Sequence, residues 1–221
     1  MAYGERRLRE ARRALHELGG ETIRAEHLLG FPDGWIEPLL AAHWQREHPE
    51  RSTTTGVSKP PYSEAEHQEA RYDGDDLRTA LVRCFSDAQP TMIAFPDPLD
   101  RHPDHRATGR FTLLALREIT HGQKGTQQAM PRLLAEHVHG PDWPPGWNAS
   151  RPSTPTDSAL DLPSSLPARG LERVILTLTQ DEVTRKRRAL DQYTSQQQVM
   201  PSLLAAFVRR TEPFTLFRGT E

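Results

Sequence analysis

Two short apolar runs, each leading into a helix-like segment, constrain the fold of this chain more than any other feature. The first run is TMIAFP, residues 91–96, and the second is LERVILTLT, residues 171–179. Leucine and β-branched residues in runs of this length are typical of strands. A helix is predicted at about residues 104–119 after the first run, and another after the second, where Thr179 and Glu182 can form a capping box. Strands that alternate with helices indicate an α/β fold with a mainly parallel sheet.

The remaining elements follow from hydrophobic spacing and from turn residues. The chain is interpreted as one domain, residues 1–221, with polar loop excursions at about 48–72 and 140–169. The other predicted elements are helices at 5–18, 35–47, 73–88 (capped by Asp73 or Asp75), a helix from 179 to about 196 and one at 201–209, strands at 22–30 and 132–138, and a short final run at 213–217.

Charge and cysteine usage exclude several classes of protein. The 28 basic and 30 acidic residues give a formal charge of −2, which argues against the basic face of a nucleic-acid-binding protein. No apolar stretch reaches the length of a membrane span and no secretory signal opens the sequence. The single cysteine, Cys84, excludes an internal disulfide, and its place on the apolar stripe of a helix favours a buried structural thiol over a nucleophile. We therefore expect a cytoplasmic protein.

The densest polar cluster of the sequence is Asp100-Arg101-His102-Pro103-Asp104-His105. It follows a predicted buried strand and begins a helix, which is where open α/β sheets place their ligand sites. His105, at the helix start, could donate a ring nitrogen to a metal. His102 could hold or deliver a proton, with Asp104 or Asp100 orienting it.

An HxxH spacing by itself also describes surface histidines that cap a helix. A zinc site needs three protein ligands with an open fourth position, and this cluster offers only one or two. His137 and His139 alternate on a predicted strand, so their side chains could line the same site, although the pattern does not require it. The sequence has neither a glycine-rich phosphate loop nor a GxSxG elbow.

Taken with four other segments, these residues resemble the LmbE-like (PIG-L) family of zinc-dependent N-deacetylases. The resemblance extends over about residues 5–215. Its segments are Arg7-Leu8-Arg9-Glu10 (the family's RxxE), Gly30-Phe31-Pro32-Asp33-Gly34 (its DG loop), Asp100 to His105 (its DxHPDH), the helix with Lys186, Ala189, Leu190, Tyr193, Ser195 and Gln196, and the ending Phe207 to Phe214.

The resemblance implies a Rossmann-like three-layer sandwich and hydrolysis of an N-acetyl group on an amino-sugar conjugate, a small-molecule substrate. It makes His105 a zinc ligand, His102 the residue that stabilises the oxyanion or acts as acid, and Asp104 the residue that tunes His102. It also makes Arg7 and Asp33 substrate-binding residues. The alternative for Arg7 is a solvated helix residue, and for Asp33 a turn former.

One departure from the family pattern is serious. The family's N-terminal HPDDE motif, which supplies two zinc ligands and the general base, does not occur in the sequence. The resemblance therefore implies that the first strand-helix-strand unit is missing, that the chain is truncated at its N terminus, and that it is inactive alone. The rival expectation is a pseudoenzyme or binding protein that kept the fold. A metal-free hydrolase using His102 and Asp104 is a third alternative, but no nucleophile is evident.

Overall fold

The computed structural model describes residues 2–23, 26–45, 47, 49–122, 130–147, 159, 160, 162 and 171–217. The chain divides into two compact units. Residues 27–138 and 215–221, here called the central unit, form one, and residues 1–26 and 139–214, here called the terminal unit, form the other. Most of the predicted 140–169 excursion, and His48, lie outside the described residues.

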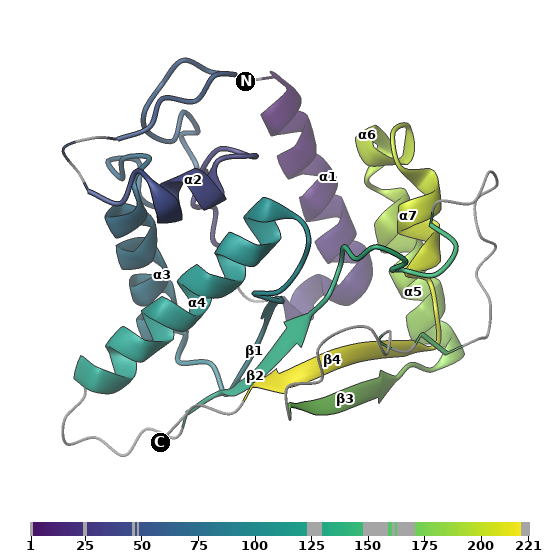
Figure 1. The fold of residues 1–221 in the computed structure, drawn as a ribbon. Helices are drawn as coiled ribbons and strands as arrows, with labels where there is room; N and C mark the ends of the chain where they lie inside the picture. Colours follow the sequence, from purple (N-terminus) through teal and green to yellow (C-terminus); the bar gives the residue numbers. More distant parts are fainter. Residues whose placement is uncertain are drawn as a thin grey trace. The chain divides into compact units, whose positions relative to one another are not determined.

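The four strands of the sheet are β1 (Met92–Pro96), β2 (Arg132–Glu136), β3 (Glu172–Thr177) and β4 (Thr211–Phe217), in the order β1-β2-β4-β3 (Figure 1). β1 and β2 are parallel, with Met92 opposite Arg132 and Pro96 opposite Glu136. β4 runs antiparallel to β2. An α/β fold is confirmed, but the sheet is only partly parallel.

Three helices of the central unit carry its core. They are α2 (Ile36–Ala41), α3 (Gly74–Ala88) and α4 (Pro103–Gly122), and Figure 1 shows α2 and α3 beside α4. α4 also packs on β1. One buried cluster lies between α4 and the strands and a second among the helices. They consist of Ile93, Phe95, Leu116, Leu133 and Ala135, and of Leu39, Tyr72, Leu77 and Phe111.

Apart from β3 and the first part of β4, the elements described in the terminal unit are helices. Its longest helix, α1 (Ala2–Gly19), packs against α5 (Gln180–Asp191). Thr179 and Glu182 form the predicted capping box at the start of α5. The remaining helices are short: η1 (Gly20–Thr22), α6 (Thr194–Gln197) and α7 (Pro201–Ala206).

Four predictions of secondary structure were wrong in part, one of them the helix predicted at 201–209, which ends at Ala206. The described residues of 22–30 contain no strand, and this segment ends at Gly30, whose φ of +71° and close approach to Pro60 (3.0 Å from a Cβ built on the glycine) suit a turn. The helix predicted at 35–47 ends at Ala41. The helix predicted to reach residue 196 ends at Asp191, and α6 follows as a separate turn.

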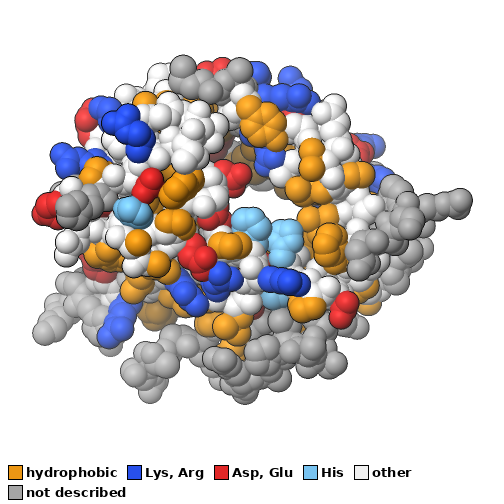
Figure 2. Space-filling model, turned by 45° about the horizontal axis from the view of Figure 1, so that its top comes forward, with side chains coloured by type: hydrophobic (Ala, Val, Ile, Leu, Met, Phe, Trp, Pro, Cys, Tyr) orange, Lys and Arg blue, Asp and Glu red, His pale blue; other side chains and the backbone are white. Residues whose placement is uncertain are grey.

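The surface mixes charges of both signs. On the face shown in Figure 2, acidic, basic and hydrophobic side chains are interspersed, and neither sign of charge forms a continuous patch among the residues described there. None of the helices in the described part of the chain has both the length and the apolar character of a membrane span.

Candidate functional site

The predicted cluster lies where β1 and β2 end. Because these strands are parallel and in register from Met92 to Pro96, the segments that follow them leave the same edge of the sheet. The amide N–H of Asp97 continues the pairing, since it donates to the carbonyl of Glu136 at 2.8 Å. Residues 97–105 and residues 137–138 therefore come together at the carboxyl ends of the strands, the position predicted for a ligand site.

Asp100 joins these two segments. Its side chain is buried, at 1% exposure. Oδ1 accepts a hydrogen bond from the amide of His102 at 2.8 Å, and Oδ2 accepts one from the amide of Val138 at 2.7 Å. The Asp100 amide in turn donates to the carbonyl of Asp97 at 2.9 Å. One carboxylate thus fixes the turn before α4 and the backbone after β2.

The two histidines of the cluster lie beside each other. The ring centroids of His102 and His105 are 4.7 Å apart, with 39° between the planes. Nδ1 of His105 is 3.6 Å from Oδ1 of Asp100. A carboxylate that accepts a hydrogen bond from one ring nitrogen orients a metal-ligating histidine, and Asp100 lies on that side of His105, although 3.6 Å is longer than a hydrogen bond. The His105 side chain is 30% exposed, so it is neither turned fully to solvent nor sealed in the core.

His137 is a third histidine of this region. It follows β2 directly and is 3% exposed. Burial lowers the pKa of His137; Asp100 and Asp97 oppose that shift, and His105 adds to it. The neutral form of the His137 imidazole is therefore favoured. The sequence singled it out only as one of an alternating pair, and the second member, His139, belongs to the terminal unit.

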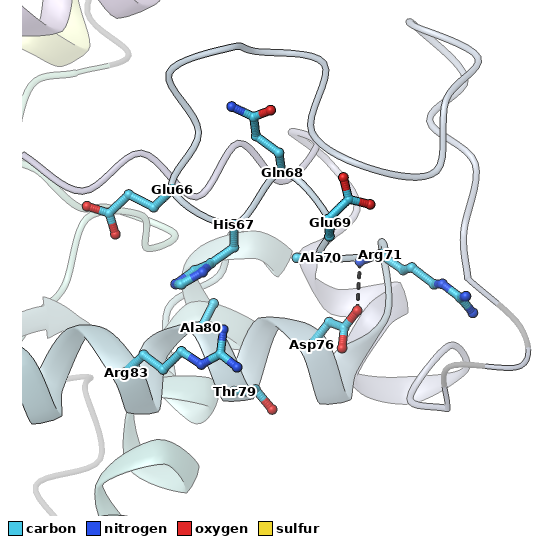
Figure 3. Close-up of a pocket in the computed structure, with 10 residues that line it drawn as sticks. All are labelled: Glu66, His67, Gln68, Glu69, Ala70, Arg71, Asp76, Thr79, Ala80 and Arg83. Carbon is cyan, nitrogen blue, oxygen red and sulfur yellow. Dashed lines mark hydrogen bonds between the residues drawn. The ribbon is translucent and has the colours of Figure 1, made fainter.

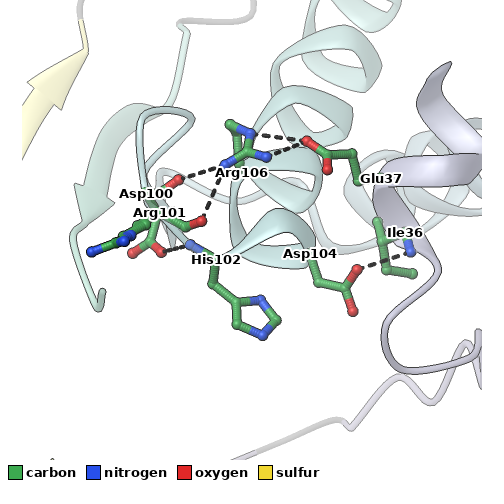
Figure 4. A network of polar contacts seen from close by, with 7 residues as sticks. All are labelled: Ile36, Glu37, Asp100, Arg101, His102, Asp104 and Arg106. Atoms are coloured by element: carbon green, nitrogen blue, oxygen red, sulfur yellow. Dashed lines mark hydrogen bonds and ion pairs between the residues drawn. The ribbon is translucent and has the colours of Figure 1, made fainter. Parts of the chain in front are cut away.

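Asp104 contacts the DG loop. Its carboxylate is 7% exposed and accepts from the amides of Gly34 (2.5 Å) and Ile36 (3.0 Å), the turn that contains Asp33 and the start of α2. Arg106 makes a parallel link, since it pairs with Glu37 and donates to the carbonyl of Asp100 at 3.1 Å (Figure 4). Two segments predicted from the sequence to share a site are thus joined through the first turn of α4.

Asp33 and Arg7 complete the predicted set. Asp33 is exposed in the turn before α2, beside Gly34 at φ +80°. Arg7 lies on α1 in the terminal unit. With the Gln196 amide oxygen turned toward it, Nη1 and Nη2 of Arg7 donate to that oxygen at 2.7 and 2.9 Å. This contact gives Arg7 a structural partner within its own unit.

A cavity of about 660 Å³ lies elsewhere in the central unit (Figure 3). Its walls are the loop 66–71 and one side of α3, with Arg71, Asp76 and Arg83 among the lining residues. None of the five residues predicted to form the site lines this cavity. The volume of this cavity is therefore no guide to the predicted site.

A zinc site requires three protein ligands close to one another. Among the described residues, only His27, Glu66 and Cys84 bring three potential ligand atoms within 4.8 Å of one another. Around His105, therefore, the described residues do not by themselves supply the three protein ligands of a zinc centre. His105, with Asp100 behind it, is suited to be one ligand.

A family model described as GlcNAc-PI de-N-acetylase, PIG-L, matches residues 1–116, more than half of the chain. The chain belongs to the PIG-L family. The matched stretch contains Arg7, Asp33 and the whole Asp100 to His105 cluster, so the predicted resemblance is confirmed there. No curated protein and no solved structure matches the chain. PIG-L membership indicates hydrolase activity of the deacetylase type, on a small-molecule substrate and generally dependent on a metal.

Proposed function

We propose that this PIG-L protein serves in removal of an N-acetyl group from an amino-sugar conjugate. The observation that supports this most is the placement of His102 and His105 side by side at the carboxyl end of β1, with Asp100 behind His105. The pair divides two tasks. His105 is the metal ligand, and His102 faces the scissile amide.

His102 is proposed to act on the reacting amide. As the tetrahedral intermediate forms, an imidazole beside the carbonyl oxygen stabilises its negative charge, and a protonated imidazole can give its proton to the departing amine. Asp104 tunes this residue indirectly, because it fixes the first turn of α4, which His102 directly precedes, to the loop of residues 34–36. Asp33 and Arg7 are proposed to contact the sugar conjugate.

The metal is proposed to be zinc, with His105 as one ligand. Because the described residues around His105 do not complete a three-ligand site, and the sequence contains no HPDDE motif, we also propose that residues 1–221 alone are inactive. The same observation favours one alternative: a protein that retains the PIG-L fold and binds the conjugate without hydrolysing it.

Acetate release from N-acetylglucosamine conjugates tests the proposal. We expect none from the 221-residue chain, and release from a version extended at its N terminus by a PIG-L segment carrying HPDDE, with zinc added. In the extended protein, His102→Asn should lower kcat by about 10²–10⁴-fold, and His105→Asn should abolish zinc-dependent acetate release. Asp181→Asn, an exposed position on α5, serves as the control.

Two results would overturn parts of this scheme. Acetate release by the short chain in the presence of a chelator would exclude the metal-dependent mechanism. An extended protein that holds zinc at His105 and binds the conjugate, yet releases no acetate, would establish the non-catalytic alternative.

A further inference from the structure

Three side chains of metal-ligating type meet in the central unit, none of them in the HPDH segment. Nδ1 of His27 is 2.6 Å from Oε1 of Glu66, and Sγ of Cys84 is 3.9 Å from Oε2 of the same carboxylate. One ligand atom from each residue lies within 4.8 Å of the other two. Three different donor types, nitrogen, oxygen and sulfur, therefore converge on one point.

Separate parts of the fold hold these residues in place. Cys84 lies on α3, which is anchored in the core by Leu77. The Glu66 amide donates to the carbonyl of Leu28 at 3.1 Å, so the backbone beside His27 is bonded to the backbone of Glu66. Because the ligands come from a helix and two mutually bonded loops, little backbone movement is needed to assemble them.

The spacing is close to that of a coordinated ion. Ligands of a tetrahedral zinc, at about 2.0–2.3 Å from the metal, lie about 3.4–3.6 Å from one another. The Sγ–Oε2 separation of 3.9 Å is already near this value. The 2.6 Å contact between His27 and Glu66 is a hydrogen bond, and it would lengthen as the cation replaces the shared proton.

The chemistry of the donors selects the cation. Imidazole and thiolate are ligands of zinc and similar divalent transition metals, whereas magnesium and calcium prefer sites made of oxygen atoms alone. Burial, with Glu66 and Asp87 nearby, raises the pKa of the Cys84 thiol, which therefore carries a proton at neutral pH in the absence of a cation. Coordination would release that proton.

We propose that His27, Glu66 and Cys84 form a binding site for a divalent transition-metal ion of the zinc type, separate from the histidine cluster at the end of β1. The His27 and Glu66 side chains are 38% and 36% exposed, so a fourth position is left to water or to a small ligand. Three protein ligands with an open position bind an exchangeable ion, and we expect a chelator to remove it. Glu66 is also one of the residues that line the cavity, and Figure 3 shows its carboxylate pointing away from Arg83 and Asp76.

Cobalt(II) titration of the 221-residue protein tests this site directly. Cys84 is the only cysteine of the chain, so a thiolate-to-cobalt charge-transfer band in the near ultraviolet reports this site and cannot arise at His102 or His105. We expect a saturable band at one equivalent of cobalt, which added zinc removes. Cys84→Ser should abolish it, and Glu66→Gln and His27→Ala should each weaken cobalt binding about tenfold or more.

The control variant is Glu69→Gln, which makes the same chemical change in the same loop, at a side chain that is 90% exposed and pairs with Lys59 at 3.3 Å. It should leave the titration unchanged, as should His105→Asn. Circular dichroism of each variant confirms that it is folded. The proposal is overturned if no band forms at saturating cobalt, or if the band survives both Glu66→Gln and His27→Ala, which would mean that the thiol binds cobalt alone.

Discussion

Asp104 has a structural role that can be measured apart from catalysis. Its two carboxylate oxygens accept from the amides of Gly34 and Ile36. In Asp104→Asn the amide nitrogen replaces one acceptor and opposes a backbone N–H, so we expect the free energy of unfolding to fall by about 1–3 kcal/mol. Urea denaturation measures this loss. Asp181→Asn, also in the first turn of a helix but exposed, should change it far less, and equal losses would contradict the assigned contact.

At this same scale, the sequence indicated which residues form the polar cluster but not which backbone groups its side chains contact. The residues that follow TMIAFP were enough to single out His102, Asp104 and His105 as candidates. This was possible because the strand, turn and helix that position them are each predicted from local patterns. The sequence did not decide whether Asp104 or Asp100 orients His102. The choice depends on which backbone amides lie nearby, and these belong to residues 34–36 and 138, which only the folded chain brings into contact.

Among the elements, those with local end signals were predicted best. Asp73 caps α3 and Thr179 with Glu182 caps α5, both as expected. β4 was seen only as a short run, because its antiparallel pairing with β2 joins residues about 80 positions apart in the sequence, and no local pattern encodes that partner. β3 was predicted as a strand, and it is one. Its residues Ile175 and Leu176 are nevertheless 51% and 53% exposed, and β3 is the last strand in the order of the sheet.

The contact between α4 and the end of β1 depends on Gly109. A Cβ at this position would lie 2.3 Å from the carbonyl oxygen of Pro96 and 3.0 Å from the nitrogen of Pro98. Intrinsic helix propensity favours alanine over glycine by about 1 kcal/mol, but overpacking against backbone costs about 1–3 kcal/mol or more. We therefore expect Gly109→Ala to lower the thermal unfolding midpoint. Arg110→Ala, exposed on the same helix, should not, and a stabilised Gly109→Ala would refute the close approach.

At the scale of the whole chain, Glu10 ties the two ends of the terminal unit together. Its side chain is 2% exposed, and it accepts from the Ser195 hydroxyl (2.5 Å), the Ser195 amide (3.0 Å), the Thr194 hydroxyl (2.8 Å) and Nε of Arg6 (3.0 Å). Burial alone would raise the pKa of Glu10, but these hydrogen bonds outweigh it and lower the pKa from 4.5 to about 2. Contacts across 185 positions thus depend on one ionised carboxyl.

The sign of the resulting pH dependence follows from that lowered pKa. Glu10 stabilises the folded state fully above about pH 4.5, and this contribution is lost as the pH falls from 4.5 toward 2. In Glu10→Gln we expect the free energy of unfolding at neutral pH to fall by about 1–3 kcal/mol, with a smaller further loss between pH 4.5 and 2 than in the unchanged protein. Urea denaturation at a series of pH values measures both effects. Glu5→Gln, exposed on the same helix, should reproduce the unchanged curve, and parallel pH profiles for Glu10→Gln and the unchanged protein would show that Glu10 is not the group whose ionisation holds α1 to α6.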